Sequence, residues 1–476
     1  MVRLRVHDPY SMELDLEVPL DHGSSELQAW FFLPAQLGVD EPVFDRDRYY
    51  RDLTVYVRYQ SPRRELAEAD VLIAPLTDEG AERSLRLYAA CIRAQLRVRG
   101  RALRDLLAAG EDPEPSIHRL IAESEALLAR HRERRARAVN VTPQVQASLA
   151  AIEDFLSMQA LELWFRVQER APHPALAAAI TAETAIREAG GLHGPLDAAD
   201  ALDNERFVTR LNRLKKYVLG ALHLRFVSTR RAQNAQDLAF GIAAALAMTV
   251  AVGLQLVAAW TFGTPGGPRE WASLLPFLGF AVGGYILKDR LKDHLKGWFA
   301  QRLPLWLFDR RLDLCPESAA SPLGVAEETV RLLHMPEVDP QIAALRAMGD
   351  DAIEQVVRAS DDVIHYRRVL RLGREASANC PEAQAIEQIL RFNIRDWLRR
   401  MDEPNRELFQ LDEDGLAHRI QGPKTYRVTV VLAVNNGGKR ELVHRVLVLS
   451  RDGIVRIAEP TLAGDGGSGG APSAVV

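Results

Sequence analysis

Few residue combinations in this sequence have the spacing that catalysis requires. His7 lies beside Asp8, and His365 follows Asp361 by four residues, so each imidazole has a carboxylate that could orient it as a general base. A surface or capping role explains both pairs and is more common. Motifs typical of phosphate loops, nucleophile elbows, zinc proteases and dinucleotide sites do not occur. We therefore assign no catalytic residue, and keep an enzyme without a recognisable motif, hydrolase-like and membrane-tethered, as an alternative.

Metal and cofactor sites are not expected either. Cys91, Cys315 and Cys380 are odd in number and far apart, which argues against a disulfide framework and a thiolate metal site and fits a reducing compartment. The acidic stretch at 412–415 has the composition of a calcium loop but lacks its ligand spacing and closing glutamate. We interpret it as a turn.

Basic side chains gather in three places. Arg86, Arg93, Arg97, Arg101 and Arg104 form a stripe at helical spacing, residues 130–137 contain five arginines, and a third basic segment spans 206–231. Such clusters can bind nucleic acid or anionic lipid. For the first two we favour solvated helix faces paired with nearby acids. Because the net charge is only −4, nucleic acid is an unlikely partner.

Two uncharged runs dominate the middle of the chain. Residues 238–262 and 271–287 contain no charged side chain, and the first is about 37 Å long as a helix, enough to cross a bilayer. The link at 263–270 holds two prolines and three glycines, which end one helix and begin the next. We predict two antiparallel transmembrane helices; a buried hairpin in a soluble protein is the alternative.

The flanks of these runs predict their orientation. Basic residues resist translocation, so both flanks should stay in the cytoplasm with the turn outside. The lipid bilayer is then a partner, and the residues expected to contact its headgroups are Arg206, Arg210, Arg213, Lys215, Lys216, Arg225, Arg230, Arg231, Lys288, Arg290, Lys292 and Lys296.

Small residues within the runs predict close helix packing. Ala243, Ala247 and Ala251 recur every four residues, and Gly279 and Gly283 form a GxxxG motif. These residues could pack the hairpin on itself or on another copy. The runs contain no Asp, Glu, Lys, Arg or His, which makes an oligomeric pore the least favoured of three hypotheses.

Periodicity predicts the elements on either side. Alternating apolar residues indicate strands at 13–20, 27–33, 53–59, 426–434, 442–449 and 454–457. Helical spacing indicates helices at 116–138, 143–170, 174–188, 324–334, 340–348, 351–371 and 382–400, besides one that carries the arginine stripe and an amphipathic helix from 207 that runs on into the first span.

The predicted fold class is an α+β membrane protein, with a two-helix transmembrane hairpin between two mixed, mainly helical cytoplasmic parts that each hold a small antiparallel sheet. Its parts are a small β region (1–78), a helical region (79–205), a juxtamembrane basic helix (206–237), two spans (238–262, 271–287) around an extracytoplasmic turn (263–270), an amphipathic helix (288–303), an α+β domain (304–462) and a flexible tail (463–476).

The function expected from this organisation is a membrane-anchored cytoplasmic scaffold or regulatory interaction protein. It should bind a cytoplasmic protein partner or another copy of itself. The Ala- and Arg-rich composition suggests a bacterium, and hence the inner membrane with both termini in the cytoplasm.

Overall fold

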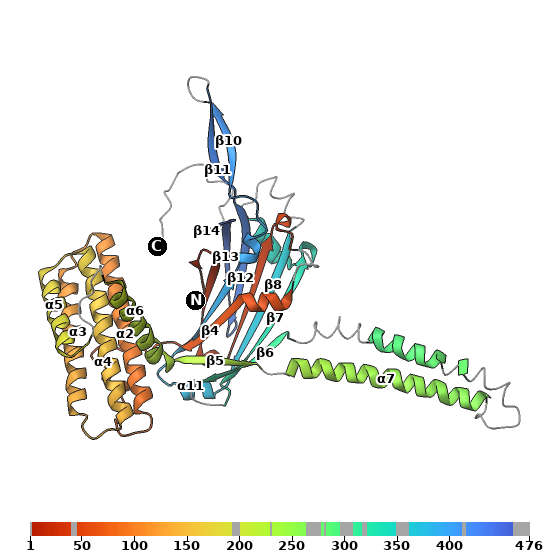
Figure 1. Cartoon of the computed structure of the whole chain (residues 1–476), viewed down its shortest axis with the longest axis horizontal. Coiled ribbons are helices and arrows are strands. Elements are labelled where there is room, and N and C mark those ends of the chain that lie inside the picture. Colours follow the sequence, from red (N-terminus) through yellow and green to blue (C-terminus); the bar gives the residue numbers. More distant parts are fainter. Residues whose placement is uncertain are drawn as a thin grey trace.

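The computed structural model consists of a barrel-like sheet, a helical bundle on one side of it and a long helical arm on the other (Figure 1). It describes residues 2–39, 45–192, 200–228, 231–262, 278–279, 282–295, 308–316, 321–348, 361–411 and 416–459. The predicted turn (263–270), tail (463–476) and acidic stretch (412–415) lie outside these residues, as does much of the second predicted span.

One antiparallel sheet of 12 strands forms the centre of the molecule. Its spatial order is β1-β2-β9-β4-β5-β6-β7-β8-β3-β12-β13-β14. The two edge strands, β1 and β14, nearly meet. The amide of Ile454 in β14 donates a hydrogen bond to the carbonyl of Pro9, which directly follows β1, at 2.8 Å. The strands are β1 (Val2–Asp8), β2 (Ser11–Pro19), β3 (Ser24–Leu33), β4 (Leu53–Tyr59), β5 (His223–Ser228), β6 (Arg310–Pro316), β7 (Gly324–His334), β8 (Asp362–Leu372), β9 (Ala385–Asn393), β12 (Tyr426–Asn436), β13 (Lys439–Ser450) and β14 (Gly453–Ala458).

The predicted fold class is wrong, because the two soluble parts do not have separate sheets. β3 pairs with both β8 and β12, and β2 pairs with β9, so strands from the two ends of the chain share one sheet. The described part of the chain also has only one helix long and apolar enough to cross a membrane. The protein is therefore not a two-helix transmembrane hairpin between two domains.

Aromatic side chains fill one part of the barrel core. Phe31 lies 5.3 Å from Phe392 between ring centroids, and Tyr49 lies 4.6 Å from Phe392 and 5.8 Å from Tyr366. Tyr49 comes from α1 (Arg46–Asp52), which Asp45 caps by accepting a hydrogen bond from the Asp47 amide. Both faces of β3 are buried, since Trp30 and its neighbours pack under α9 (Pro340–Ala347).

The barrel interior also contains charged groups. Arg368 and Glu328 form a buried ion pair, the Arg368 Nε donates to Gln388 at 2.9 Å, and the Tyr366 hydroxyl donates to Glu328 at 2.8 Å. These residues occupy inward positions of β7, β8 and β9. Polar residues at inward positions hide the two-residue alternation on which strand prediction relies.

Three predicted helices are wrong for this reason. The structure has β7 at 324–334, β8 over the described part of 351–371, and β9 followed by the short α12 (Arg395–Leu398) within 382–400. The helix expected at 340–348 is present as α9, capped by Asp339, and the six predicted strands are present with small differences in their ends. The remaining short elements are α11 (Glu375–Asn379) and the separate hairpin of β10 (Asn405–Leu411) and β11 (Ala417–Pro423).

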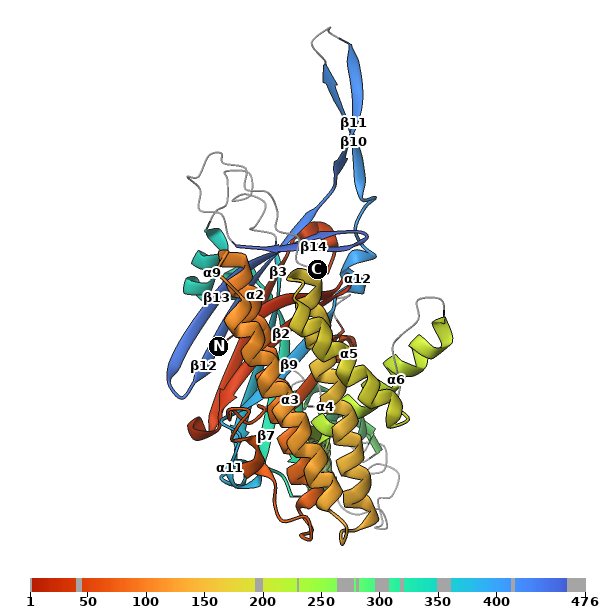
Figure 2. The ribbon, with the colours of Figure 1, turned by 90° about the vertical axis from the view of Figure 1, so that its left-hand side faces the viewer.

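The bundle is inserted between β4 and β5. Its helices are α2 (Ala81–Ala109), α3 (Glu114–Arg137), α4 (Pro143–Arg170), α5 (Pro174–Ala189) and α6 (Ala201–Gly220), and α2 to α5 stand side by side (Figure 2). The apolar stripe of α2 is buried from Leu85 to Leu103. Thr142 caps α4 and Pro143 occupies its first turn, where a proline costs no hydrogen bond.

The arm is inserted between the neighbouring strands β5 and β6. It comprises α7 (Arg231–Phe262) and the described helical residues 282–295, which run back beside α7 (Figure 1). The expected continuity of α6 with the first span is wrong, because β5 intervenes and pairs with β4 and β6.

The half-buried histidine of β8, His365, gives a test of the sheet. His365 stacks on Trp30 at 4.8 Å and contacts Gln28 at 3.1 Å. Burial, and then the charges of Arg331 and Arg367, lower its pKa to about 4, although Glu26 acts in the opposite direction. Between pH 6.5 and 4 the unfolded state therefore binds more protons than the folded state, so the free energy of unfolding falls as the pH falls.

We expect His365→Phe, which keeps an aromatic ring on Trp30, to reduce this acid sensitivity by roughly 2 kcal/mol. Urea unfolding in mild detergent at pH 7 and pH 4.5 measures it. An equal loss of stability in the parent and the variant would show that His365 does not stay neutral in the folded state.

Candidate functional site

The helical bundle has two clefts lined by arginines. The first, of about 910 Å³, lies between α3, α4, α5 and α6. The second, of about 760 Å³, lies between α2, α4 and α6 and reaches Arg5 of β1. Both have volumes in the range typical of small-ligand sites. We name them the paired cleft and the basic cleft, because their arginines differ in whether they have acidic partners.

The basic cleft has eight cationic side chains and one carboxylate. Its polar lining residues are Arg5, Arg93, Arg97, Arg101, Arg104, Gln159, Glu162, Arg166, Arg170, Asn212 and Lys215, and its apolar ones include Leu96, Leu103, Leu107, Leu163, Val167 and Leu211. Glu162 is already bound by Arg166 at 2.6 Å. Arg5 is likewise bound, by Glu13 and Asp15.

Six cations of the basic cleft have no acidic partner among the residues that the structure describes. Within the described part of the chain, no ion pair is formed by Arg93, Arg97, Arg101, Arg104, Arg170 or Lys215. Gly100 of α2 brings two helices close together at this point, because a Cβ there would lie 2.6 Å from Leu163 Cδ1 of α4. The close approach concentrates the charges of α2 and α4 around one space.

Arg93 is the most constrained of these cations. It is 7 % exposed, and its Nε donates to Gln159 Oε1 at 3.1 Å. Burial, followed by the charges of Arg97 and Arg58, lowers the pKa of Arg93 to about 10. Burial and the charges of Arg93 and Arg97 also lower the pKa of Lys215. The positive groups therefore repel one another in the folded state.

The paired cleft differs because four of its six arginines, all but Arg206 and Arg213, form ion pairs with carboxylates of the described residues. Asp154 of α4 is buried and accepts from Arg187 of α5 at 2.8 Å and from Arg210 of α6 at 2.5 Å. Arg132 binds Glu183 at 2.6 Å. These ion pairs join four helices, and they give the paired cleft a structural role.

The residues of 130–137 agree with the interpretation of a paired helix face. Arg130 and Arg134 bind Asp70, Arg135 binds Glu153, and Arg137 binds Glu133. The arginine stripe on α2 does not fit the interpretation of a paired helix face. Only Arg86 of the stripe forms an ion pair among the described residues, with Glu82, and its other four arginines line the basic cleft. Its spacing was visible in the sequence. The contributions of Arg166, Arg170 and Lys215 from other helices were not.

The predicted lipid-contact residues are dispersed. Arg206, Arg210 and Arg213 line the paired cleft, Lys215 lines the basic cleft, Lys216 is exposed on α6, and Arg225 lies on β5 in the sheet. Lys288, Arg290 and Lys292 lie on the arm. Arg230 and Lys296 are outside the described residues, as is the side chain of Arg231.

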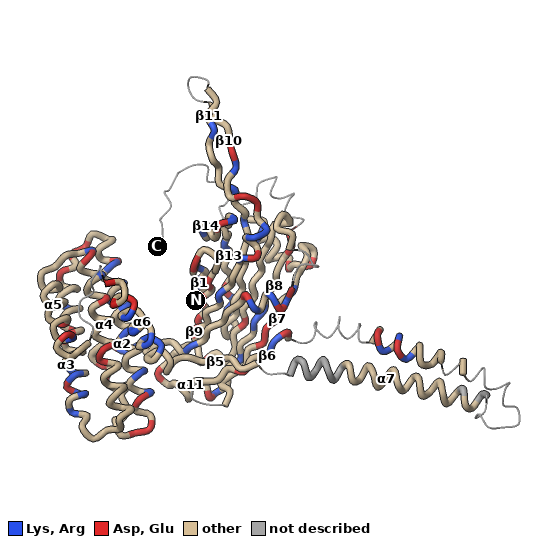
Figure 3. Tube along the Cα trace, viewed as in Figure 1, with Lys and Arg blue, Asp and Glu red and all other residues tan. Residues whose placement is uncertain are grey.

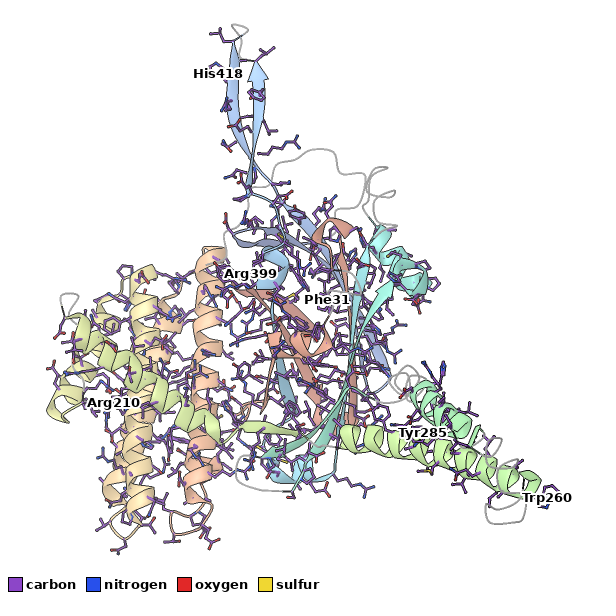
Figure 4. The ribbon with its side chains drawn as sticks, turned by 45° about the vertical axis from the view of Figure 1, so that its right-hand side comes forward. Phe31, Arg210, Trp260, Tyr285, Arg399 and His418 are labelled. Carbon is purple, nitrogen blue, oxygen red and sulfur yellow. The ribbon has the colours of Figure 1, made fainter. Side chains whose placement is uncertain are left out.

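The arm exposes apolar side chains (Figure 4). Leu256 is 65 % exposed and Trp260 is 91 % exposed. Ala243, Ala247 and Ala251 are buried, on the side where Gly284 approaches Leu254, whose Cβ lies 3.8 Å from the position of an added Cβ. Gly279 and Gly283 have no described neighbour within 4 Å of such an atom, so among these three glycines Gly284 is the one that faces α7.

Other groups that could do chemistry are not assembled into a site. His7 contacts Glu13 at 3.4 Å, and Asp361 binds Arg346 at 3.1 Å rather than His365. Cys91, Cys315 and Cys380 are buried and form no disulfide with one another. Glu114, His118 and His173 are close enough to hold a metal ion, with ligand atoms within 4.8 Å of one another, but the first two are exposed.

The comparisons with known proteins do not identify a family. The chain matches no protein-family model, no curated protein and no solved structure. The site must therefore be interpreted from its own geometry.

The buried carboxylate of the paired cleft provides a stability test. We expect Asp154→Asn to lower the free energy of unfolding by about 3 kcal/mol or more, because it removes the buried negative charge that Arg187 and Arg210 share, and breaking a buried ion pair is strongly destabilising. Glu133→Gln, which removes the exposed Arg137 pair, should cost about 0.5 kcal/mol or less. Denaturant unfolding compares them. Equal losses would remove the structural role of Asp154.

Proposed function

We propose that the protein is a membrane-attached interaction protein, with a scaffolding or regulatory role, whose arm enters a lipid bilayer. The observation that supports this most directly is the composition of α7. Phe240–Val257 is a helical stretch of 18 residues, and only 17 % of it is buried. Its sequence contains no charged residue, so in water this surface would be hydrated at a large free-energy cost.

The distribution of the exposed residues favours lipid over a protein partner. Large apolar side chains are exposed at 242, 246, 248, 250, 252, 256, 257 and 260. At 3.6 residues per turn these positions cover about 200° of the helix circumference. A partner helix covers a stripe, whereas lipid surrounds every side that the protein leaves open. The three buried alanines occupy the remaining side.

The neighbouring helix limits how deep the arm can insert. Because Gly284 lies against Leu254 and the helices run antiparallel (Figure 1), Lys288 is near the level of Val250. Charged residues begin at Lys288 and continue toward the sheet (Figure 3). Only the part of α7 from about 250 to 262, roughly 18 Å, is free of charge on both helices. This is shorter than the ~30 Å hydrocarbon core and supports insertion from one face.

The sheet keeps the soluble parts together on that face. β5 and β6 are hydrogen-bonded neighbours, so the segment between them leaves and returns to the same place. The bundle and the barrel then lie on the same side of the membrane. We assign this side to the cytoplasm of a bacterium, at the inner membrane, because basic residues such as Lys288, Arg290 and Lys292 beside the apolar tip favour the cytoplasmic leaflet.

Membrane attachment can be tested with a matched pair of variants. Val252→Asp combined with Leu256→Asp places two charges on exposed positions of α7, and we expect flotation with anionic liposomes to fall at least tenfold. Val71→Asp changes an exposed residue, 72 % exposed, that lies near the bundle, and should float like the parent. If the parent purified in detergent did not float, or the α7 variant floated equally well, the proposed function would be wrong.

The depth of insertion is a separate prediction. A fluorophore on Leu256→Cys should be quenched strongly by lipids brominated in their acyl chains, whereas one on Leu246→Cys should be quenched weakly because it lies at headgroup level. Both positions are exposed and on the same helix, and the native cysteines are buried. Equal strong quenching at both positions would contradict shallow insertion while leaving attachment intact.

A further inference from the structure

We propose that the basic cleft is a binding site for a small soluble molecule that carries two or more phosphate groups together with an apolar or aromatic part. This inference does not depend on membrane attachment, because every residue that carries it belongs to the bundle or to the adjacent strands.

The first argument is that cations of the basic cleft lack carboxylate partners. The same bundle neutralises the arginines of 130–137, and Arg187 and Arg210 of the paired cleft, with carboxylates. Arg93, Arg97 and Lys215 have no such partner within the described residues. Arg93 is buried, and a buried guanidinium without a counter-charge destabilises the fold. An anion bound in the cleft would supply the missing charge, with the forked geometry that arginines offer to phosphate.

The second argument concerns the number of anionic groups. Arg93, Arg97, Arg101 and Arg104 lie along one side of α2, and the first and last are about 16 Å apart along the helix axis. Arg170 and Lys215 line the same space from α4 and α6. A single monovalent anion cannot contact groups spread over this length, whereas linked phosphates can.

The third argument comes from the rest of the lining. Leu103, Leu163 and Leu211 give the cleft an apolar surface beside its arginines, which suits a ring or an aliphatic part of the ligand. A volume of about 760 Å³ accommodates a metabolite of nucleotide size.

The position of the cleft favours a soluble ligand over a lipid headgroup. The bundle lies on the opposite side of the sheet from the arm (Figure 1). If the arm enters the bilayer, the basic cleft is directed toward the aqueous phase, and if it does not, no membrane surface is brought to the bundle.

Calorimetric titration of the full chain in mild detergent tests the site, with ATP as the probe and inorganic tripolyphosphate as the probe without an aromatic part. We expect one ATP per chain, a weaker affinity for tripolyphosphate, and at least tenfold weaker binding of both to the Arg97→Gln/Lys215→Gln variant. Both positions are exposed, so the fold should tolerate the change. Arg119→Gln/Arg440→Gln removes two exposed charges outside the cleft and should bind like the parent.

A second measurement separates a binding role from a structural one. Without ligand, the Arg97→Gln/Lys215→Gln variant should melt at a higher temperature than the parent, because the mutual repulsion is reduced, and saturating ATP should raise the melting temperature of the parent alone.

The proposal is overturned if neither probe binds the parent at low salt, or if both double variants bind equally. It is also overturned if binding is confined to anionic vesicles, which would indicate a lipid site, or to a single-stranded RNA oligonucleotide, which would indicate a nucleic-acid surface. The two proposals can fail separately. If the parent did not float with liposomes but bound ATP, the ligand site would be supported and the proposed membrane attachment would be wrong.

Discussion

Closure of the 12-stranded sheet is the constraint on which the rest of the molecule depends. The central strand β3 is bracketed by β8 and β12, which lie more than 300 residues later in the chain, so neither end can complete its core alone. Because such contacts span nearly the whole chain, loop-closure entropy opposes them strongly. The bundle and the arm do not interrupt the order of the sheet, since each is inserted between strands that are direct neighbours, β4 with β5 and β5 with β6.

The barrel interior shows how a closed sheet can tolerate charge. Arg368 is 1 % exposed and Glu328 is 2 % exposed, and each has further partners in Gln388 and Tyr366. Burial raises the pKa of Tyr366, and the Glu328 carboxylate raises it further, so the tyrosine stays a hydrogen-bond donor. Breaking this network would leave a buried charge unpaired, which is far more costly than the net contribution of the intact pair.

The elements that could be predicted from the sequence are those whose pattern lies within the element itself. Helices with a clear apolar stripe and a capping residue, such as α4 after Thr142, began within a residue or two of their predicted positions, and strands with an apolar inward face were found as expected. β8 and β9 were missed because Arg368 and Gln388 occupy inward positions. The joining of both ends into one sheet was not predictable, since strand pairing across 300 residues leaves no local pattern.

The candidate site was predictable only in part for the same reason. The stripe on α2 was visible, but whether an arginine is paired depends on residues brought to it by other elements. Arg134 binds Asp70, which lies more than 60 residues earlier in the chain, whereas Arg97 forms no ion pair in the described part of the chain and its charge lowers the pKa of Arg93 and of Lys215. No rule of sequence spacing distinguishes these two outcomes.

The basic cleft lies near the point where the bundle joins the sheet. β4 leads into the bundle and β5 follows it, and these strands pair only at Val57–Leu224 and Arg58–His223. Arg58 therefore lies where the bundle meets the sheet, bound to Glu387 of β9 at 2.8 Å, and its charge contributes to lowering the pKa of Arg93. Any movement of the bundle about this short pairing would change the distance between the sheet and helix cations. An anion in the cleft would attract these cations and offset their mutual repulsion.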